Sequence, residues 1–218
     1  QHLHAHFGQA PATVAWYTIE VARRHRAGRT YSWSMTIHGW HEFADERDAR
    51  LREKVAAADF VVAVSDFTRA QLYRIADTND RGKIHVIRCG VDLARFAARD
   101  NEPSNTPPRV AIVARLSPEK GHIVLVDAVA ALQARGFGVI VDVVGPEIDS
   151  HGGDVRSHAE AAGIADAFIW HGALAPHGVA AVLAGADVFC LPTFAEGLPV
   201  VIMEAMARGV PVVTTYIA

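Results

Sequence analysis

Short apolar segments alternate with segments of helical periodicity along the second half of this chain, and this alternation limits the fold more than any other feature. Strands that alternate with helices of about ten to fifteen residues form right-handed βαβ units, in which parallel strands are covered by helices on both faces. The pattern therefore predicts an α/β fold. The predicted strands are residues 109–114, 139–144, 167–170, 188–191 and 210–215, and the predicted helices are residues 122–136, 154–163, 176–185 and 199–208.

The first half follows the same pattern with more polar residues. Between the halves, residues 97–108 are polar, rich in proline and without periodicity, which is typical of a linker. We therefore expect two α/β domains with parallel sheets, residues 1–96 and 109–218. We expect both to be incomplete, because the chain begins without methionine directly on a strand and stops just after one. The predicted strands of the first half are residues 2–7, 31–37, 60–64 and 84–88, and its predicted helices are residues 11–27, 47–58 and 65–75.

Composition limits the partners of the protein. The 218 residues are 50% hydrophobic and carry a net charge of −3 without any dense run of Lys or Arg, which argues against nucleic acid as the main partner. No window approaches the roughly 18 apolar residues of a membrane span. Cys89 and Cys190 are the only cysteines and have no metal-ligand spacing, which fits a reducing cytoplasm.

Parallel sheets bind ligands beyond the carboxyl ends of their strands, so the loops that follow strands are the candidate sites. Arg115 and Lys120 lie in the loop after strand 109–114, just before a predicted helix. Two cations beside the unpaired amides of a helix N-terminus can bind a diphosphate. The alternative interpretation is that both side chains are solvated on the loop.

Two carboxylates mark the next candidate site. Glu196 ends the loop after strand 188–191, and Glu204 is the only side chain between Gly197 and Ala207 that carries charge. An ionised carboxylate in apolar surroundings needs hydrogen-bond donors, which a ligand could supply. Carboxylates recognise vicinal hydroxyls well, because each can accept two hydrogen bonds. The alternative is that Glu196 lies in water and that a buried Arg pairs with Glu204.

Histidines mark the third and fourth candidate sites, which are separate. His38 follows strand 31–37 and could act as a general base or as an orienting group. The alternative is a structural role, since the chain has twelve histidines. His2, His4 and His6 alternate onto one face of a strand, but no further Cys, Asp or Glu ligand is implied, so we expect no metal site.

Together these segments resemble the retaining, nucleotide-sugar-dependent glycosyltransferases of family 4, along essentially the whole chain. The most specific element is a pair of glutamates separated by seven residues, Glu196 and Glu204 here. The segment from Arg115 to Gly121 and the strand end from Cys89 to Asp92 are its usual companions. The segments 4–7, 36–39 and 60–65 are most similar to members that build bacterial exopolysaccharide, including the colanic acid type.

The resemblance implies two Rossmann-like domains of the GT-B type, with residues 1–96 on the acceptor side and residues 109–218 on the nucleotide-sugar side. It implies that Arg115 and Lys120 hold the donor diphosphate and stabilise its developing charge. Glu196, with the amides of Gly197 and Leu198, would contact the hexose. Glu204 would bind the ribose diol, and His38 would lie near the reacting carbon as the catalytic residue. The residues in these expected roles are Arg115, Lys120, Glu196, Gly197, Leu198, Glu204 and His38.

The same resemblance implies transfer of a hexose from a nucleoside-diphosphate sugar to a glycan or lipid-linked acceptor, with retention of configuration and without a metal or other cofactor. It implies a cytoplasmic enzyme and leaves open a peripheral association with the inner membrane surface. Three enzyme alternatives are a sugar-nucleotide epimerase, a phosphorylase and a retaining glycosidase. A non-catalytic sugar-nucleotide-binding module is the alternative from another class.

The chain departs from the family pattern at Gly145-Pro146-Glu147, where many members have a glycine-acidic-glycine-proline turn, so we assign no donor contact there. The glycine-rich acceptor loop and the region beyond residue 218 are also missing. We therefore expect this 218-residue chain to turn over poorly or not at all by itself.

Overall fold

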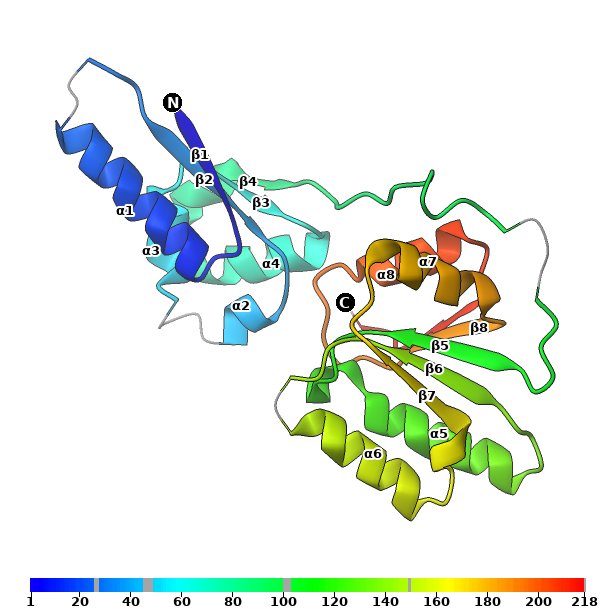
Figure 1. The fold of residues 1–218 in the computed structure, drawn as a ribbon. Coiled ribbons are helices and arrows are strands. Elements are labelled where there is room, and N and C mark those ends of the chain that lie inside the picture. The colour runs from blue at the N-terminus through cyan, green and yellow to red at the C-terminus, as the bar shows by residue number, and fades with distance from the viewer. Residues whose placement is uncertain (26–27, 45–48, 100–102, 149, 218) are drawn as a thin grey trace. The chain divides into compact units, whose positions relative to one another are not determined.

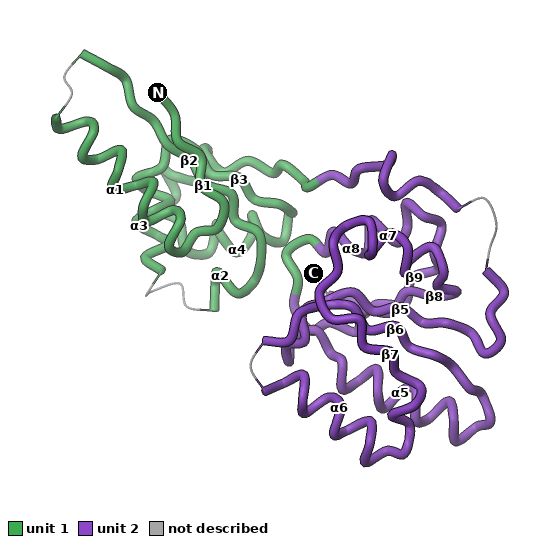
Figure 2. The backbone as a smooth tube through the Cα atoms, in the orientation of Figure 1, with its two compact units in different colours: residues 1–89, 196–198, 218 green, residues 90–195, 199–217 purple. Residues whose placement is uncertain are grey.

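The computed structural model describes residues 1–25, 28–44, 49–99, 103–148 and 150–217. The chain forms two compact units, which Figure 2 distinguishes by colour. Unit 1 contains Gln1–Cys89 together with Glu196–Leu198, and unit 2 contains Gly90–Ala195 and Pro199–Ile217. Each unit has its own parallel sheet and its own hydrophobic core.

Unit 1 is built on a four-stranded parallel sheet in the order β1-β2-β3-β4 (Figure 1). Its strands are β1 His2–His6, β2 Ser32–Ile37, β3 Phe60–Ala63 and β4 Ile84–Val86. Its helices are α1 Ala10–His25, α2 His41–Ala44, α3 Leu51–Ala57, α4 Asp66–Ile75 and the 3-10 helix η1 Thr78–Lys83.

Strand alternation gives the two faces of this sheet different chemistry, because successive side chains point to opposite faces. One face carries Trp33, Met35 and Ile37 of β2, which pack in a single core with buried residues of α1, α3 and α4. The intervening positions carry polar side chains. The polar side chains that alternate with the core residues are His2, His4, His6, Ser32, Ser34 and Thr36.

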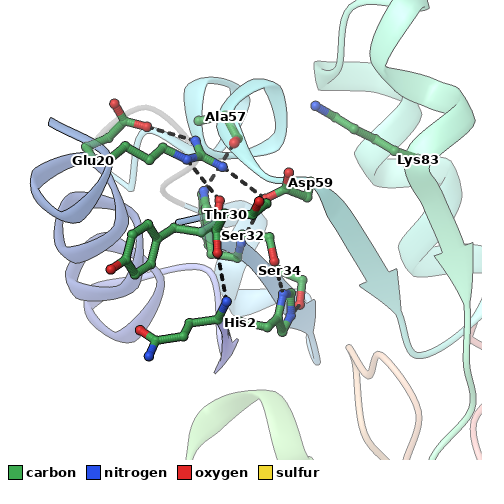
Figure 3. Close-up of polar contacts among 12 residues, drawn as sticks. His2, Glu20, Thr30, Ser32, Ser34, Ala57, Asp59 and Lys83 are labelled. Atoms are coloured by element: carbon green, nitrogen blue, oxygen red, sulfur yellow. Dashed lines mark hydrogen bonds and ion pairs between the residues drawn. The ribbon is translucent and has the colours of Figure 1, made fainter. Parts of the chain in front are cut away.

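A polar network ties α1 to the amino-terminal end of β2. Arg23 donates to the carboxylates of Glu20 (3.1 Å) and Asp59 (3.2 Å), and its Nε donates to the carbonyl oxygen of Tyr31 (3.1 Å). Asp59 also accepts from the backbone N–H of Trp33 (2.8 Å), so that one carboxylate joins the helix to the strand (Figure 3). Charge-assisted bonds of this kind stabilise more than neutral ones.

Unit 2 is built on a five-stranded parallel sheet in the order β7-β6-β5-β8-β9. Its strands are β5 Arg109–Val113, β6 Ile140–Val144, β7 Phe168–Gly172, β8 Val188–Leu191 and β9 Val212–Thr214. Its helices are α5 His122–Ala134, α6 His151–Ala161, α7 Pro176–Gly185, α8 Val200–Ala207 and the 3-10 helices η2 Pro118–Lys120 and η3 Ala165–Ala167. Helices α5 and α6 cover one face, and α7 and α8 cover the other (Figure 1).

The strand order of unit 2 explains where a ligand can bind. The chain runs from β5 outward to β6 and β7, and then returns past β5 to β8 and β9. Parallel sheets bind ligands at the point where the order reverses, beyond the carboxyl ends of the strands. In unit 2 this point lies between β5 and β8, whose residues pair directly.

The predicted α/β class with two parallel sheets is confirmed, and most elements lie within three residues of their predicted bounds. The predicted helix 47–58 is wrong at its start, because the described part of the helix begins at Leu51; residues 45–48 lie outside the described residues. Helix α2 was not predicted, because a single turn of four residues leaves no periodic pattern.

The described part of the predicted linker packs against unit 2. Arg99 donates to the carbonyl oxygens of Ala186 (2.6 Å) and Gly209 (3.2 Å), and Phe96 just before it is buried in the core of unit 2. The division into units also falls earlier, between Cys89 and Gly90. The assignment of residues 1–96 and 109–218 as the two domains stays a prediction.

Candidate functional site

The loops after β5 and β8 lie side by side because these two strands are neighbours. The backbone carbonyl of Glu119, in the first loop, accepts from the N–H of Phe194 (2.8 Å) and from the hydroxyl of Thr193 (2.9 Å), both in the second loop. The Thr193 side chain is completely buried. The segment with Arg115 and Lys120 is therefore joined to the segment that leads to Glu196.

Gly121 allows this close approach. A Cβ atom at this position would lie 2.0 Å from the carbonyl oxygen of Pro192, and the backbone has φ +72°, which favours glycine. Helix α5 begins at the next residue, His122. The first amides of a helix have no partner within the helix, so α5 presents anion-binding N–H groups directly beside this loop.

Arg115 and Lys120 differ in their surroundings. The Arg115 side chain is half exposed and lies 3.5 Å from the carboxylate of Glu119, while Lys120 is half-buried. Burial acts to raise the pKa of Glu119, but the bond from the Ser117 hydroxyl and the two cations together lower it. Glu119 is thus held as an anion beside the cations that were predicted to bind a diphosphate.

Glu204 lies half-buried in α8 among apolar residues. Burial raises the pKa of its carboxyl, and the positive charge of Arg95 partly opposes that rise. Within the part of the chain that the structure describes, no ion pair or side-chain hydrogen bond is recorded for this carboxylate. The alternative in which a buried arginine forms an ion pair with Glu204 is therefore not observed there.

The remaining predicted donor residues belong to the other unit. Glu196 and Leu198 are half-buried and Gly197 is buried, and all three are grouped with unit 1. Arg115, Lys120 and Glu204 belong to unit 2, whereas the segment Glu196–Leu198 is grouped with unit 1. The roles of these donor residues stay predictions.

His38 lies at the carboxyl end of β2 in unit 1. Its Nε2 is 2.8 Å from Nδ1 of His6, at the end of the neighbouring strand β1. Burial lowers the pKa of His38; the Glu42 carboxylate opposes this shift, and His6 and His41 reinforce it. A neutral imidazole that is hydrogen-bonded to a second ring can accept a proton, which is what a general base requires.

Two more residues surround His38 that the sequence patterns did not assign to this site. The Phe7 ring centroid is 4.7 Å from that of His38, and Phe7 has a backbone φ of +72°, which is uncommon outside glycine. The second residue is His6, for which the sequence pattern suggests only the rejected metal site on β1. The signal that could have found His6 is strand register, since parallel pairing of β1 and β2 places both strand ends together.

The other histidines of β1 form a row with hydroxyls of β2. His2 lies 2.8 Å from the hydroxyl of Ser32 and 2.7 Å from that of Ser34, and His4 bridges Ser34 (2.6 Å) and Thr36 (2.8 Å) in the same way (Figure 3 shows the His2 end). Among the described residues, no group of three or more His, Cys, Asp or Glu is placed to hold a metal ion. The ring nitrogens of His2 and His4, which a metal would need, are instead hydrogen-bonded to hydroxyls of β2.

Comparison with known proteins identifies the class. Residues 95–218 match the model of the family described as glycosyl transferases group 1, and the chain belongs to this family. This agrees with the resemblance to nucleotide-sugar-dependent glycosyltransferases of family 4.

Individual relatives point the same way. The chain is 35% identical, over 163 residues, to the glycosyltransferase WcaL of Escherichia coli K12, which is named for colanic acid biosynthesis; the match covers 72% of this chain and 39% of that protein. It is 26% identical to TuaC of Bacillus subtilis, named for teichuronic acid biosynthesis, over 98% of this chain and 52% of that one. The chain thus spans about half the length of these relatives or less.

The fold is shared with solved glycosyltransferases. The crystal structure of Anabaena HepE in complex with UDP and glucose superposes with a TM-score of 0.78 at 20% identity, over 94% of this chain and 56% of that one. At this identity the likeness shows the fold alone. It confirms the predicted GT-B architecture with two parallel sheets.

Proposed function

We propose that the protein transfers a hexose from a nucleoside-diphosphate sugar to a glycan or lipid-linked acceptor, with retention at the anomeric carbon. The main support for this proposal is the contact between the loops after β5 and β8 in unit 2. There, two cations and the first amides of α5 lie on a loop that is hydrogen-bonded to the loop leading into the paired-glutamate segment. Membership of the glycosyltransferase family supports the same reaction class.

Different residues bind the diphosphate, the ribose and the hexose of the donor. Arg115, Lys120 and the amides at the start of α5 bind the diphosphate, whose negative charge grows as the glycosidic bond breaks. Glu204 accepts hydrogen bonds from the ribose diol, which would supply the donors that its carboxylate lacks within the described residues. Glu196 accepts from hexose hydroxyls, next to the amides of Gly197 and Leu198.

We assign the acceptor side of the reaction to unit 1. His38, which burial keeps neutral, acts near the reacting carbon and the acceptor hydroxyl. Stabilisation of the leaving diphosphate by fixed cations accounts for most of the rate in this scheme, so no metal or other cofactor takes part.

The biological setting follows from the relatives. Proteins named for colanic and teichuronic acid biosynthesis match this chain, which favours synthesis of an exopolysaccharide or another cell-surface polysaccharide. Among the described helices, none is both long and apolar enough to cross a membrane. We place the enzyme in the cytoplasm, where nucleotide sugars are made, with a peripheral contact to the membrane that carries lipid-linked acceptors.

Binding of donors to this chain is the first test. We expect calorimetric titration to show binding of at least one UDP- or GDP-sugar, and Arg115→Ala to weaken it about tenfold or more, as the loss of a charge-assisted phosphate contact would. Arg135→Ala is the matched control, because Arg135 is an exposed arginine of unit 2 at the far end of α5. Equal affinity in both variants would remove the diphosphate role from Arg115.

Turnover is the second test, and it needs a longer protein that contains this sequence. His38→Ala should abolish transfer while donor affinity stays unchanged, and the product should keep the anomeric configuration of the donor. Undiminished transfer by His38→Ala would remove His38 from the mechanism. Donor binding without any transfer by the longer protein would favour a non-catalytic sugar-nucleotide-binding module instead.

A further inference from the structure

Glu42, the second residue of α2, is a buried carboxylate whose hydrogen bonds, among the described residues, all come from backbone N–H groups. It is 1% exposed and accepts hydrogen bonds from three N–H groups: those of Gly8 (2.5 Å), His38 (2.5 Å) and Gly39 (2.9 Å). Gly8 follows β1, and the other two residues follow β2. One carboxylate therefore links the carboxyl ends of two adjacent strands.

Lys54, in α3, is a buried cation that binds the same segment from its other side. It is 2% exposed, and its Nζ donates to the carbonyl oxygens of Gly8 (2.7 Å) and Gln9 (3.0 Å). Burial lowers the pKa of Lys54, and the nearby Arg50 adds to this shift. A charged group that is buried at this cost is retained only where it makes strong hydrogen bonds.

The two charges meet at Gly8, whose N–H binds the anion and whose carbonyl binds the cation. The space around Gly8 is full, since a Cβ atom there would lie 2.8 Å from side-chain atoms of both Ile37 and Leu51. Glycine thus allows the backbone to approach both charges. The residue before it, Phe7, has a left-handed backbone, and its ring contacts His38.

We propose that Glu42 and Lys54 are positioning residues, which fix the loops after β1 and β2 so that His38 is held in one orientation toward the acceptor. The importance of that orientation for transfer rests on the proposed function. Two features favour positioning over general stabilisation. Within the described residues, every hydrogen bond of these side chains goes to the backbone of the two loops, and these loops carry Phe7 and also His38, the partner of His6 at the end of β1.

The electrostatics give the proposal a second readout. The groups that act on the charge of the His38 ring are the Glu42 carboxylate, which favours the protonated ring, and His6 of β1 and His41 of α2, which disfavour it. Removal of the Glu42 charge should therefore lower the pH at which the His38 ring titrates. A role limited to packing would leave this titration where it is.

The test uses NMR on the isotopically labelled 218-residue chain with Glu42→Gln, Lys54→Met and a control, Lys83→Met. Lys83 also donates to a backbone carbonyl in unit 1, that of Ala56 (2.7 Å), but it touches neither loop. We expect Glu42→Gln to speed amide exchange at Gly8, His38 and Gly39 at least tenfold and to lower the titration midpoint of His38. Lys54→Met should speed exchange at Gly8 by a similar factor, and Lys83→Met should change none of these values.

An unchanged His38 midpoint in Glu42→Gln would overturn the proposal. So would equal acceleration at the β3 amides and at the loops, or a failure of both variants to fold while Lys83→Met folds, since either result would show general stabilisation of the unit. None of these readouts involves transfer. The proposed function can fail, if His38→Ala keeps turnover in a longer protein, while the loop measurements hold, and the reverse is equally distinguishable.

Discussion

His122 gives the sharpest prediction of stability, because the fold buries it without hydrogen bonds. It is 2% exposed at the start of α5, and neither ring nitrogen has a hydrogen-bond partner among the described residues. Burial, reinforced by the nearby His151, lowers its pKa from 6.5 to about 4. The ring is therefore neutral in the folded chain at pH values where the unfolded chain would protonate it.

The sign and size of the effect follow from this shift. The pKa of His122 is lower in the folded chain than in the unfolded chain. The neutral ring therefore contributes its full share of the free energy of unfolding above pH 6.5, and this share is lost as the pH falls toward 4. At about pH 5 the unfolded chain has bound a proton that the folded chain has not, which lowers the free energy of unfolding by about 2 kcal/mol relative to pH 7.5. His122→Leu removes the titrating ring, so the variant does not show this fall in the free energy of unfolding. At pH 7.5 we expect the variant to be within about 1 kcal/mol of wild type, because it also removes a buried N–H without a partner.

Native-state hydrogen exchange at the buried strand residues Ile112 and Val143 measures the stability of unit 2 directly. The difference between His122→Leu and wild type should grow by about 2 kcal/mol in favour of the variant from pH 7.5 to pH 5. The control is His177→Leu, since His177 lies exposed on α7 of the same unit. A difference that does not change with pH would refute the reasoning.

Two further substitutions test the packing of unit 2. Gly121→Ala should destabilise the unit by about 1–3 kcal/mol, because it combines a positive φ with a clash against the Pro192 carbonyl; a melting temperature equal to that of wild type would contradict the described loop contact. Asp142→Ala should cost about 1.5–3 kcal/mol in urea unfolding, because Asp142 is 2% exposed and accepts a charge-assisted hydrogen bond from Nε of the partly exposed Arg109 over 2.9 Å. A loss below about 1 kcal/mol would mean that the pair behaves as a surface ion pair.

The sequence was most informative where periodicity and caps agree. Helix α7 and strand β8 have the predicted bounds, and Ser65, the first residue of the predicted helix 65–75, caps α4, with its hydroxyl accepting from the N–H of Thr68 (3.1 Å). These features depend on neighbours in the chain, which a sequence displays directly. Gly121 and Gly8 depend instead on atoms far away in the chain, so their reasons appear only in three dimensions.

Features that depend on burial of polar groups could not be predicted. Glu42 and Lys54 lie in short segments that mix polar and apolar residues, and nothing local shows that the backbone of another loop surrounds their charges. The contacts of Arg99 with carbonyl groups of unit 2 are likewise not visible in the composition of the segment 97–108, whose assignment as a linker stays a prediction. The partly buried, apolar surroundings of Glu204 were predictable, because its neighbours in the helix sequence are apolar.

We infer that the cations after β5 and the carboxylate of α8 bind different parts of one nucleotide. Calorimetric titration of wild type, Lys120→Met and Glu204→Gln with a nucleoside diphosphate and with its nucleoside tests this claim most directly. We predict that Lys120→Met weakens only the diphosphate, about tenfold or more, whereas Glu204→Gln weakens both ligands by similar factors. Unchanged affinity of both variants for the diphosphate would contradict the account.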